Sequence, residues 1–549
     1  MDTLYLQSFV NKYLFKLPVS IYTSILDGLP RTFIYYYVLR ISDPEIRSEI
    51  LDWYFNKDDV ILDLIGNGGL FSMPKIRLIT SVVTMVQLLQ LPEFRPKELH
   101  IRLSMKNTVK AELNILMGQI DKLDALPNIK ISIDPFVGKN LEPLDIEPMV
   151  RLSCMKSLSL YVNGFSIKIT KFNAYLHKMF GELQSLQDLF LSLSPEWEDM
   201  FELPQSLTSL AIYESNINFQ NVKLPKTLTK LTLSSCRLGD TKLQSIKWPR
   251  KLLELSLHDN LFTILPLSKF PQTLEVLDIS LNVSIKTVEI DNNAWLPNLR
   301  ELDASGCGIN HEMFLKLIKN WPSKLSNLQM SWHKLTHTES LQGLPDSIEY
   351  LNLACLKPIY LNSDFKLPSS LKDLTITLQG YFSKLVIPYG VENLRISGKN
   401  LRFSDLELPH SLRLLNLYIV YIGNIDFLSS DRFPRLEELH LTHSGITSID
   451  TWRAPTSLKI VKITRNPIKS LSKHAPLLNC AKLKELSFYN CQINFLEDGI
   501  QMPLQLRKLD LSFNKLGNSE KTDFKGVAVN LEGNPFTTID FGTTTRLFQ

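Results

Sequence analysis

Residues Leu367–Ile376 read LPSSLKDLTI, and nearly the same phrase returns along the chain. Leu344–Leu353 reads LPDSIEYLNL, and Leu203–Ile212 reads LPQSLTSLAI. Aligned on their apolar positions, the copies follow the template L-x-x-L-x-L-x-x-N-x-L, usually preceded by Leu-Pro-x-Ser or Leu-Pro-x-Thr. A phrase that recurs at a steady distance indicates a repeat architecture, so the period of these copies decides the fold.

The first template leucine recurs at spacings of 20 to 26 residues, about 23 on average. It falls at Leu207, Leu228, Leu252, Leu274, Leu299, Leu325, Ile348, Leu371, Val391, Leu412, Leu436, Leu458, Leu483 and Leu506. Looser copies begin at Leu186 and Met155, weaker ones near Leu126 and Pro96, and the last copy is Val529–Phe536. A single copy buries almost nothing, but stacked copies bury one continuous core.

The L-x-L alternation predicts one short strand per copy, with its leucines pointing inward. We therefore predict an α/β solenoid, a horseshoe with a parallel sheet on its concave side and a mostly extended convex side. Proline suits an extended approach to a strand and is excluded from helix interiors. It precedes the first leucine by three residues at Pro204, Pro225, Pro249, Pro271, Pro345, Pro368, Pro388, Pro409, Pro455 and Pro503. Helical turns are expected only in longer copies, best in His311–Trp321.

The ninth template position needs a small polar group that can satisfy backbone groups in the turn. It holds Asn163, Asn260, Asn282, Asn466 and Asn514, with Cys236, Cys307 and Cys491 as substitutes. This placement gives half of the six cysteines a structural role in a ladder and no redox role. In the middle copies the slot holds His333, Leu356, Gln379, Lys399 and Val420. The sequence therefore does not decide the turn geometry from about 330 to 425.

Composition excludes several classes of partner. The 549 residues carry a net charge of only +4, too weak a bias to predict binding of nucleic acid or of an anionic membrane. No apolar run reaches the roughly 18 residues of a membrane span, and the start lacks the features of a signal peptide. The cysteines form no CxxC pair, so a reducing cytoplasmic or nuclear location is expected. The single glycosylation sequon, at Asn282, is weak counter-evidence to that location.

The repeat resembles the leucine-rich-repeat superfamily over about Lys97 to Asp540. Its Leu-Pro-x-Ser-Leu form is most similar to the short repeats of certain bacterial effectors and of amoebal FNIP-type arrays. On this basis the chain divides into four predicted parts. They are a helical head and cap (1–90), degenerate repeats with a helical insertion (91–185), regular repeats (186–541) and a tail (542–549). Solenoids of this kind usually bind on their large concave face.

The head contains LPVSIYTSILDGLP at Leu17–Pro30, which resembles the opening of an F-box. It is also similar to the heads of fungal F-box-like leucine-rich-repeat proteins. The resemblance implies that the head docks on the adaptor of an SCF-type ubiquitin ligase while the repeats hold a substrate. The implied adaptor-binding residues are Leu17, Pro18, Ile21, Ile25, Leu26, Leu29 and Pro30. The alternative is that the head only caps the open end of the solenoid, which every such array requires.

A second helix is predicted in the head. Ser42–Glu45 has the spacing of a capping box, and Ile46, Ile50, Leu51 and Tyr54 then fall on one helical face.

The candidate binding surface is the concave face, which carries the side chains between the inward leucines. One predicted cluster is acidic and consists of Glu254, Asp259, Asp278, Glu301 and Asp303. The other is basic and consists of Arg395, His440, His443, Lys462 and Arg465. Aromatic anchors are expected at Trp332, Tyr350, Tyr418 and Tyr489. Together they predict a groove of split polarity for a protein partner, and the alternative is a solvated face without a partner.

No catalytic signature accompanies these residues. The motifs GxSxG, HExxH, the P-loop and GxGxxG are missing from the sequence. His440 and His443 are three apart on a predicted strand, so their side chains do not share a face, and no third metal ligand is near. We therefore expect a protein that is not an enzyme and needs no cofactor or metal.

Overall fold

The structure is a computed structural model. It describes residues 44–52, 59–63, 76–79, 82–104, 115–116, 118–126, 129–134, 155–161, 180, 183–192, 202–216, 219, 222–290, 295–319, 321–332, 335, 341, 343–355, 358–361, 365–379, 384–497, 499–517, 524, 526–535 and 546–547. The chain forms two compact units, Met1–Phe262 and Thr263–Gln549.

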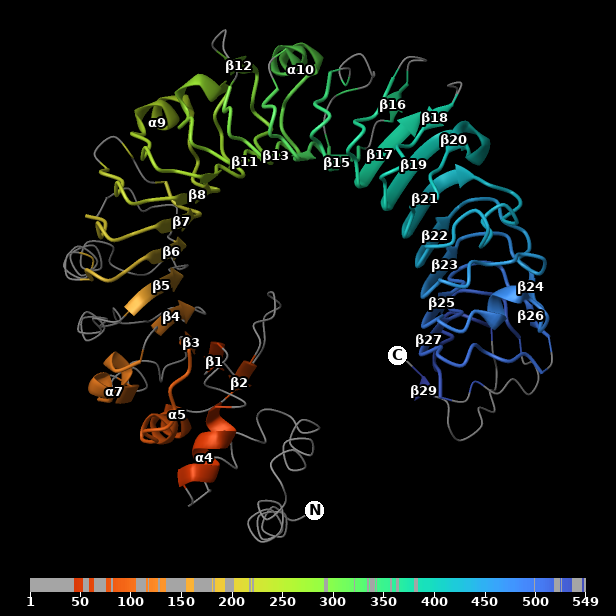
Figure 1. Ribbon diagram of the computed structural model, residues 1–549, viewed down its shortest axis with the longest axis horizontal. Helices are drawn as coiled ribbons and strands as arrows, with labels where there is room; N and C mark the ends of the chain where they lie inside the picture. Colours follow the sequence, from red (N-terminus) through yellow and green to blue (C-terminus); the bar gives the residue numbers. More distant parts are fainter. Residues whose placement is uncertain are drawn as a thin grey trace. The chain divides into compact units, whose positions relative to one another are not determined.

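The first unit contains a parallel sheet in which each repeat contributes one strand (Figure 1). Its strands are β1 (Asp59–Asp63), β2 (Ile76–Ile79), β3 (Glu98–Ser104), β4 (Ile129–Asp134), β5 (Met155–Tyr161), β6 (Asp188–Ser192), β7 (Ser209–Tyr213), β8 (Lys230–Ser234) and β9 (Glu254–Ser256). They pair in the order β2, β1, β3, β4, β5, β6, β7, β8, β9. All of these pairs are parallel, as the template predicts.

Four helices are described in this unit: α4 (Pro44–Leu51), α5 (Val82–Leu89), α7 (Ile120–Asp124) and α9 (Asp240–Ser245). The helix predicted after Ser42 is confirmed as α4, where Ile50 and Leu51 are buried. The stretch Leu17–Pro30, with all seven residues of the implied adaptor-binding surface, lies outside the described residues.

The second unit continues the same pattern. Its main-sheet strands are β11 (Val276–Asp278), β13 (Glu301–Asp303), β14 (Asn327–Gln329), β15 (Tyr350–Leu353), β17 (Asp373–Gln379), β19 (Asn393–Arg402), β21 (Leu414–Tyr421), β22 (Glu438–Thr442), β23 (Ile460–Thr464), β25 (Glu485–Ser487), β27 (Lys508–Asp510), β28 (Ala528–Asn530) and β29 (Arg546–Leu547). Each pairs in parallel with the next strand in this order.

The described parts of this unit's connections contain short elements only. They are β16 (Ile359–Tyr360), the parallel pairs β10 (Ile264–Pro266) with β12 (Thr287–Glu289), β18 (Leu385–Val386) with β20 (Leu406–Glu407), and β24 (Ser470–Leu471) with β26 (Phe495–Leu496), the helix α10 (His311–Ile318), and the 3-10 turns η5 (Leu267–Lys269), η7 (Phe403–Asp405) and η8 (Pro476–Asn479). The helix predicted within His311–Trp321 is confirmed as α10. The prediction of a parallel-strand solenoid with mostly extended connections is confirmed, and the chain has the leucine-rich-repeat fold.

The core consists of the template leucines stacked in register. Leu415, Leu439, Val461, Leu486 and Leu509 are successive partners on β21, β22, β23, β25 and β27, and none is more than 1% exposed. Burial of this continuous apolar ladder is what stabilises strands too short to be stable alone.

The asparagine at the ninth position ties each repeat to the one before it. The Oδ1 atom of Asn466 accepts from the backbone N–H groups of Ser444 (2.9 Å) and Ile446 (3.2 Å). Its Nδ2 donates to the carbonyls of Leu441 (3.0 Å) and Thr464 (2.9 Å). One buried side chain therefore satisfies four backbone groups that would otherwise cost free energy, which confirms the predicted ladder.

The ladder cysteines act in the same way. The thiols of Cys307 and Cys491 donate to carbonyls one repeat back, Ile279 at 2.9 Å and Ile463 at 2.8 Å. Burial raises the pKa of the Cys236, Cys307 and Cys491 thiols to about 12. They are held protonated at neutral pH, in agreement with a structural role.

The Pro-x-Ser part of the repeated phrase forms a tight turn that the sequence did not predict. The carbonyl of the proline accepts from the N–H of the first template leucine, as between Pro455 and Leu458 (3.1 Å). The serine hydroxyl donates to the first-position carbonyl of the preceding repeat, as from Ser457 to Leu436 (2.7 Å). The extended approach to the strand therefore ends in a hydrogen-bonded turn, and a line of hydroxyls ties neighbouring repeats together.

Candidate partner-binding face

The side chains at the third and fifth template positions lie on the opposite side of the sheet from the leucines. We call this surface of the second unit the strand face. Its fifth-position row contains, in register, Asp278, Asp303, Gln329, Asn352, Thr375, Arg395, Asn416, His440, Lys462, Ser487, Asp510 and Asn530. Neighbours in this row are about 5 Å apart because they lie on adjacent strands.

The predicted acidic cluster is distributed over both units. Asp278 and Asp303 are direct partners on β11 and β13, and the third acidic residue of the second unit, Glu301, lies exposed at the start of β13. The other two members belong to the first unit. There Glu254 forms an ion pair with Lys230 at 2.7 Å, and Asp259 accepts from Ser235 at 2.7 Å.

The fifth-position carboxylates also have a local role that the sequence did not reveal. Oδ1 of Asp278 accepts from the backbone N–H of Ser280, and Asp303 accepts from Ser305 in the same way, each at 2.9 Å. Asp510 repeats the contact with Ser512 at 3.0 Å. These carboxylates cap the end of their own strand, so each has one oxygen engaged in the turn.

The basic cluster is brought together in part. His440 and Lys462 are direct register partners, whereas Arg395 lies two strands from His440 and binds both oxygens of Asp373 at 3.1 and 3.2 Å. His443 and Arg465 lie at the carboxyl ends of β22 and β23. The cluster thus has a core of two strands, and Arg395 belongs to a separate ion pair.

His440 lies half-buried in this core. Burial lowers the pKa of its imidazole, the nearby Lys462 lowers it further, and Glu438 opposes them with a carboxylate oxygen 3.8 Å from Nε2. The Nε2 atom is itself buried and has no hydrogen-bond partner among the residues that the structure describes. The imidazole is therefore neutral at pH 7 and adds no positive charge there.

Lys462 and Arg465 differ from the other basic residues around them. Lys508 pairs with Glu485 at 3.0 Å, while Lys459 and Arg413 both pair with Glu437. Within the described part of the chain, Lys462 and Arg465 take part in no ion pair. β23 therefore presents two charges that the protein itself does not neutralise.

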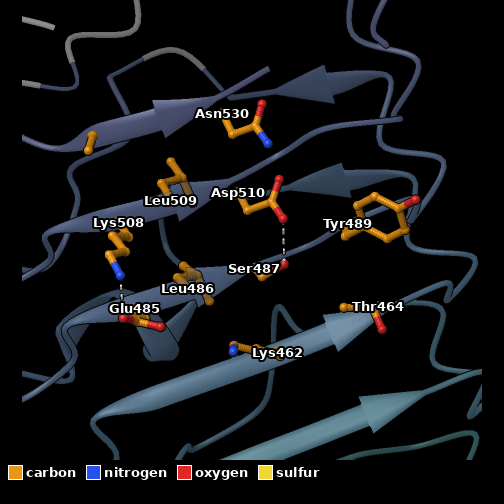
Figure 2. A pocket seen from close by; sticks show the side chains of 11 residues that line it. Lys462, Thr464, Glu485, Leu486, Ser487, Tyr489, Lys508, Leu509, Asp510 and Asn530 are labelled. Carbon is orange, nitrogen blue, oxygen red and sulfur yellow. Dashed lines mark hydrogen bonds and ion pairs between the residues drawn. The ribbon is translucent and has the colours of Figure 1, made fainter. Parts of the chain in front are cut away.

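A shallow pocket lies beside these charges on the strand face, with a volume of about 550 Å³. Figure 2 shows its lining side chains on β23, β25, β27 and β28. They are Lys462, Thr464, Glu485, Leu486, Ser487, Tyr489, Lys508, Leu509, Asp510, Ala528 and Asn530. The dashed contacts join Lys508 to Glu485 and Ser487 to Asp510, so the remaining cation of the lining is Lys462.

The eighth template position has a left-handed backbone in most copies. The φ angles are 52° at Asp259, 57° at Trp332, and 53° at both His443 and Arg465. Sequence reasoning missed this geometry because glycine, its usual signal, is rare at the position. The left-handed residue turns the chain at the end of the strand and leaves its side chain at the edge of the strand face.

Two of the predicted aromatic anchors, Tyr418 and Tyr489, lie beside the basic core. Tyr418 is 42% exposed and meets His443 edge-on, with ring centroids 6.3 Å apart. Tyr489 is half-buried and packs against Phe513 at 5.3 Å. The other two anchors belong to other repeats: Trp332 is 66% exposed just after β14, and Tyr350 is 48% exposed at the start of β15.

The described residues contain no group of three His, Cys, Asp or Glu side chains placed to hold a metal ion. Among the described helices, none combines the length and apolarity needed to cross a bilayer.

Comparison with known proteins supports the fold. A family model described as "Leucine Rich repeat" matches residues 505–519, which include β27 and the ladder asparagine Asn514. No curated protein matches the chain in sequence. The stacked register and the buried leucines show the leucine-rich-repeat fold, and the family match falls on one repeat of it.

Several solved structures are similar in fold at low identity. The mouse RP105/MD-1 complex has 19% identity over 75% of this chain and 69% of the other, with a TM-score of 0.44. YopM from Yersinia enterocolitica has 18% identity over 94% of this chain and 100% of its own, with a TM-score of 0.40. A Toll–Spatzle complex from Drosophila has 17% identity over 87% and 62%, with a TM-score of 0.42.

Proposed function

We propose that this protein functions by binding a partner protein on its strand face and not by catalysis. The observation that carries the proposal is the strand face itself, a continuous in-register row of polar side chains next to a pocket of about 550 Å³. A leucine-rich-repeat fold commonly serves protein binding, because adjacent strands present many side chains to one extended partner.

Site-specific photo-crosslinking tests this proposal on the full chain. A benzophenone amino acid replaces Ala528, which lines the pocket, or Phe495, which is 45% exposed on β26 outside the main sheet. We expect protein adducts from position 528, competed by unlabelled full chain, and few from position 495. Equal labelling from both positions would contradict a partner site on the strand face.

We further propose that the chain is the substrate receptor of an SCF-type ubiquitin ligase, acting in the cytoplasm or nucleus. Support for this role comes from the phrase LPVSIYTSILDGLP at Leu17–Pro30. The head would bind the ligase adaptor, while the strand face would hold the substrate.

Co-purification with the ligase adaptor tests this role. We expect the adaptor to bind the full chain and to be lost from the double variant Leu17→Ala with Pro18→Ala, while crosslinking from position 528 persists. The competing proposal, a leucine-rich-repeat scaffold with a capping head, predicts no adaptor in either sample. It also predicts aggregation when residues 1–90 are deleted, because the end of the core would be exposed.

A further inference from the structure

We infer that the segment held on the strand face is acidic and that Lys462 and Arg465 bind its anionic groups. The inference rests on the proposed partner-binding function and names the chemistry of the partner. It begins from Lys462 on β23 and Arg465 just after that strand, two neighbouring cations that take part in no ion pair within the described structure.

Elsewhere on this unit, a cation on one strand meets an acid on the next. Lys372 pairs with Glu349 at 2.8 Å and Arg395 with Asp373 at 3.1 Å. On β23 the register places no acid beside the cations. Lys462 lies between His440 and Ser487. Beside the pocket, Lys508 is neutralised by Glu485, whereas Lys462 and Arg465 take part in no ion pair among the described residues, so both are available to a ligand.

Two acids, Glu438 and Glu485, flank β23 at Ile460, two residues before Lys462, and both have contacts with other residues. Glu485 lines the pocket with Lys462 but forms its ion pair with Lys508 at 3.0 Å. Glu438 lies 3.8 Å from the Nε2 atom of His440. The site therefore keeps a positive potential that an incoming carboxylate or phosphate can neutralise.

The spacing of the two cations sets the spacing of the ligand. Lys462 lies within β23, and Arg465 follows its end at the left-handed turn. Three strand residues span about 10 Å, so one small anion would contact one of the two cations and not both. In a polyproline II conformation, residues three apart lie on the same side of a peptide and about 9 Å from each other, so two acidic residues separated by two others match this distance.

The neighbouring groups favour a peptide over a free anion. Thr464 lies between Lys462 and Arg465 in the sequence, and its hydroxyl is 2.8 Å from the hydroxyl of Thr442 on the neighbouring strand β22. Tyr418, packed edge-on against His443, and the half-exposed Tyr489 offer apolar surface on either side. A short segment can fill this surface, whereas a lone anion would contact only the charges.

Fluorescence anisotropy on the full chain tests the inference with three labelled peptides. Their sequences are Gly-Glu-Gly-Gly-Glu-Gly, its neutral analogue with Gln for both Glu, and a version with phosphoserine for both Glu. We expect the first and third to bind and the neutral peptide to bind at least about tenfold more weakly. The ratio between the first and third identifies the preferred anion, carboxylate or phosphate.

The chain offers a matched pair of variants. Lys462→Gln with Arg465→Gln should weaken the acidic peptides about tenfold or more. Arg413→Gln with Lys459→Gln removes the same two residue types and the same charge. Those cations are already paired with Glu437, so affinity should change less than about twofold. Circular dichroism of each variant checks that the fold is retained.

The outcomes separate this inference from the function on which it rests. Equal loss in both double variants, or no difference between acidic and neutral peptides, would overturn the acidic-segment inference. If crosslinking from position 528 still captured a protein in that case, partner binding would stand. Equally tight binding of a labelled octauridylate, lost in the Lys462/Arg465 variant, would instead assign the site to nucleic acid and overturn the peptide.

Discussion

Two regions of the second unit solve the same problem in different ways. In the ladder region, residues 436–517, the strands have five residues in β22 and β23 and three in β25 and β27. In the middle region, residues 371–425, β17, β19 and β21 have seven, ten and eight residues. Both regions must satisfy the backbone groups that follow the inward leucines.

The ladder region does this with a side chain. The Oδ1 atoms of Asn466 and Asn514 each accept from two N–H groups, and their Nδ2 atoms donate to two and three carbonyls respectively, so the strands can end early. The middle region has apolar Val420 in this slot, fully buried. There the strands continue, and β17 and β19 stay in register to Gln379 and Lys399. Longer strand pairing thus replaces the missing amide.

The continuation is interrupted once. The register between β19 and β21 shifts between Ser397 and Leu401, and Asn400 has φ 57°. A Cβ on Gly398 would come within 2.8 Å of the Leu401 Cβ, so the bulge needs glycine there. Between these two regions, short strands go with a ladder asparagine and long strands with a slot that lacks its amide contacts.

The strongest way to break this comparison is to exchange the ninth residues. Asn466→Val leaves four buried backbone groups without their partner, and we expect a loss of about 3–5 kcal/mol from the free energy of unfolding. Val420→Asn buries an amide where strand pairing already satisfies the backbone, and should cost about 2 kcal/mol. Urea denaturation gives the totals.

Hydrogen exchange at Ser444 and Ile446 locates the effect of Asn466→Val. These two amides, which follow β22, should lose protection before the amides of β22 itself do. A variant that kept their protection, or lost less than Val420→Asn, would mean that the asparagine ladder does not hold the short strands.

Alkaline pH should act on the ladder region through its thiol. The pKa of Cys491 is raised by burial from 9.0 to about 12 in the folded state. Its contribution to stability is fully present below pH 9 and is lost as the pH rises toward 12, because the unfolded state releases the proton first. At pH 10.5 the loss should be about 2 kcal/mol for this thiol.

Cys491→Ser is the control for this pH dependence, because a hydroxyl can donate to the Ile463 carbonyl without titrating in this range. Its urea midpoint should fall less between pH 8 and 10.5 than that of the unmodified chain. Identical slopes would exclude a buried, protonated thiol at Cys491.

The serine contacts sharpen the comparison because the two regions share them. Ser457 donates to the Leu436 carbonyl in the ladder region, and Ser411 donates to the Val391 carbonyl in the middle region, each at 2.7 Å. Alanine at either position should cost about 1 kcal/mol. The control Thr456→Ala, at the exposed neighbour of Ser457, should change the free energy of unfolding little. Unequal losses of stability from the two serine variants would show that the turn differs between the regions.

The smallest expected effect concerns the left-handed residue before the slot. Ile419 has φ 56° although it is β-branched, and it is 44% exposed. Ile419→Gly should therefore stabilise the protein, by up to about 1 kcal/mol. The corresponding change in the ladder region, Arg465→Gly, should gain less because arginine is unbranched at Cβ. A loss at Ile419 in thermal unfolding would mean that its side-chain packing outweighs the backbone strain.

Most of the fold could be predicted from the sequence because of the repeat. Alternation of leucines predicts each strand and its inward face, and the ninth position identifies Asn466 and Cys491 as ladder residues. The turn between Pro455 and Leu458 and the bond of the Ser457 hydroxyl were not predicted, because they join two repeats and become visible only once the register is known. The long strands of the middle region were open in the sequence because Val420 gives no polar signal.

The candidate site was predictable only in outline. Template positions place His440 and Lys462 on one face, which the register confirms. They do not tell that Arg395 is held by Asp373 or that Lys462 has no such partner, because ion pairing depends on side-chain conformations across strands. The left-handed φ of His443 and Arg465 was equally hidden, since neither residue is of the type that usually marks it.

The burial of Asn282 has a consequence for the Asn282-Val283-Ser284 sequon. This asparagine is 0% exposed, and its Nδ2 donates to the Ile279 carbonyl at 2.6 Å. The nitrogen that a glycan would occupy is the one that closes the turn. The same nitrogen is thus needed for glycosylation and for the hydrogen bond that closes the turn. A chain glycosylated at Asn282 could not close this turn as the structure shows it.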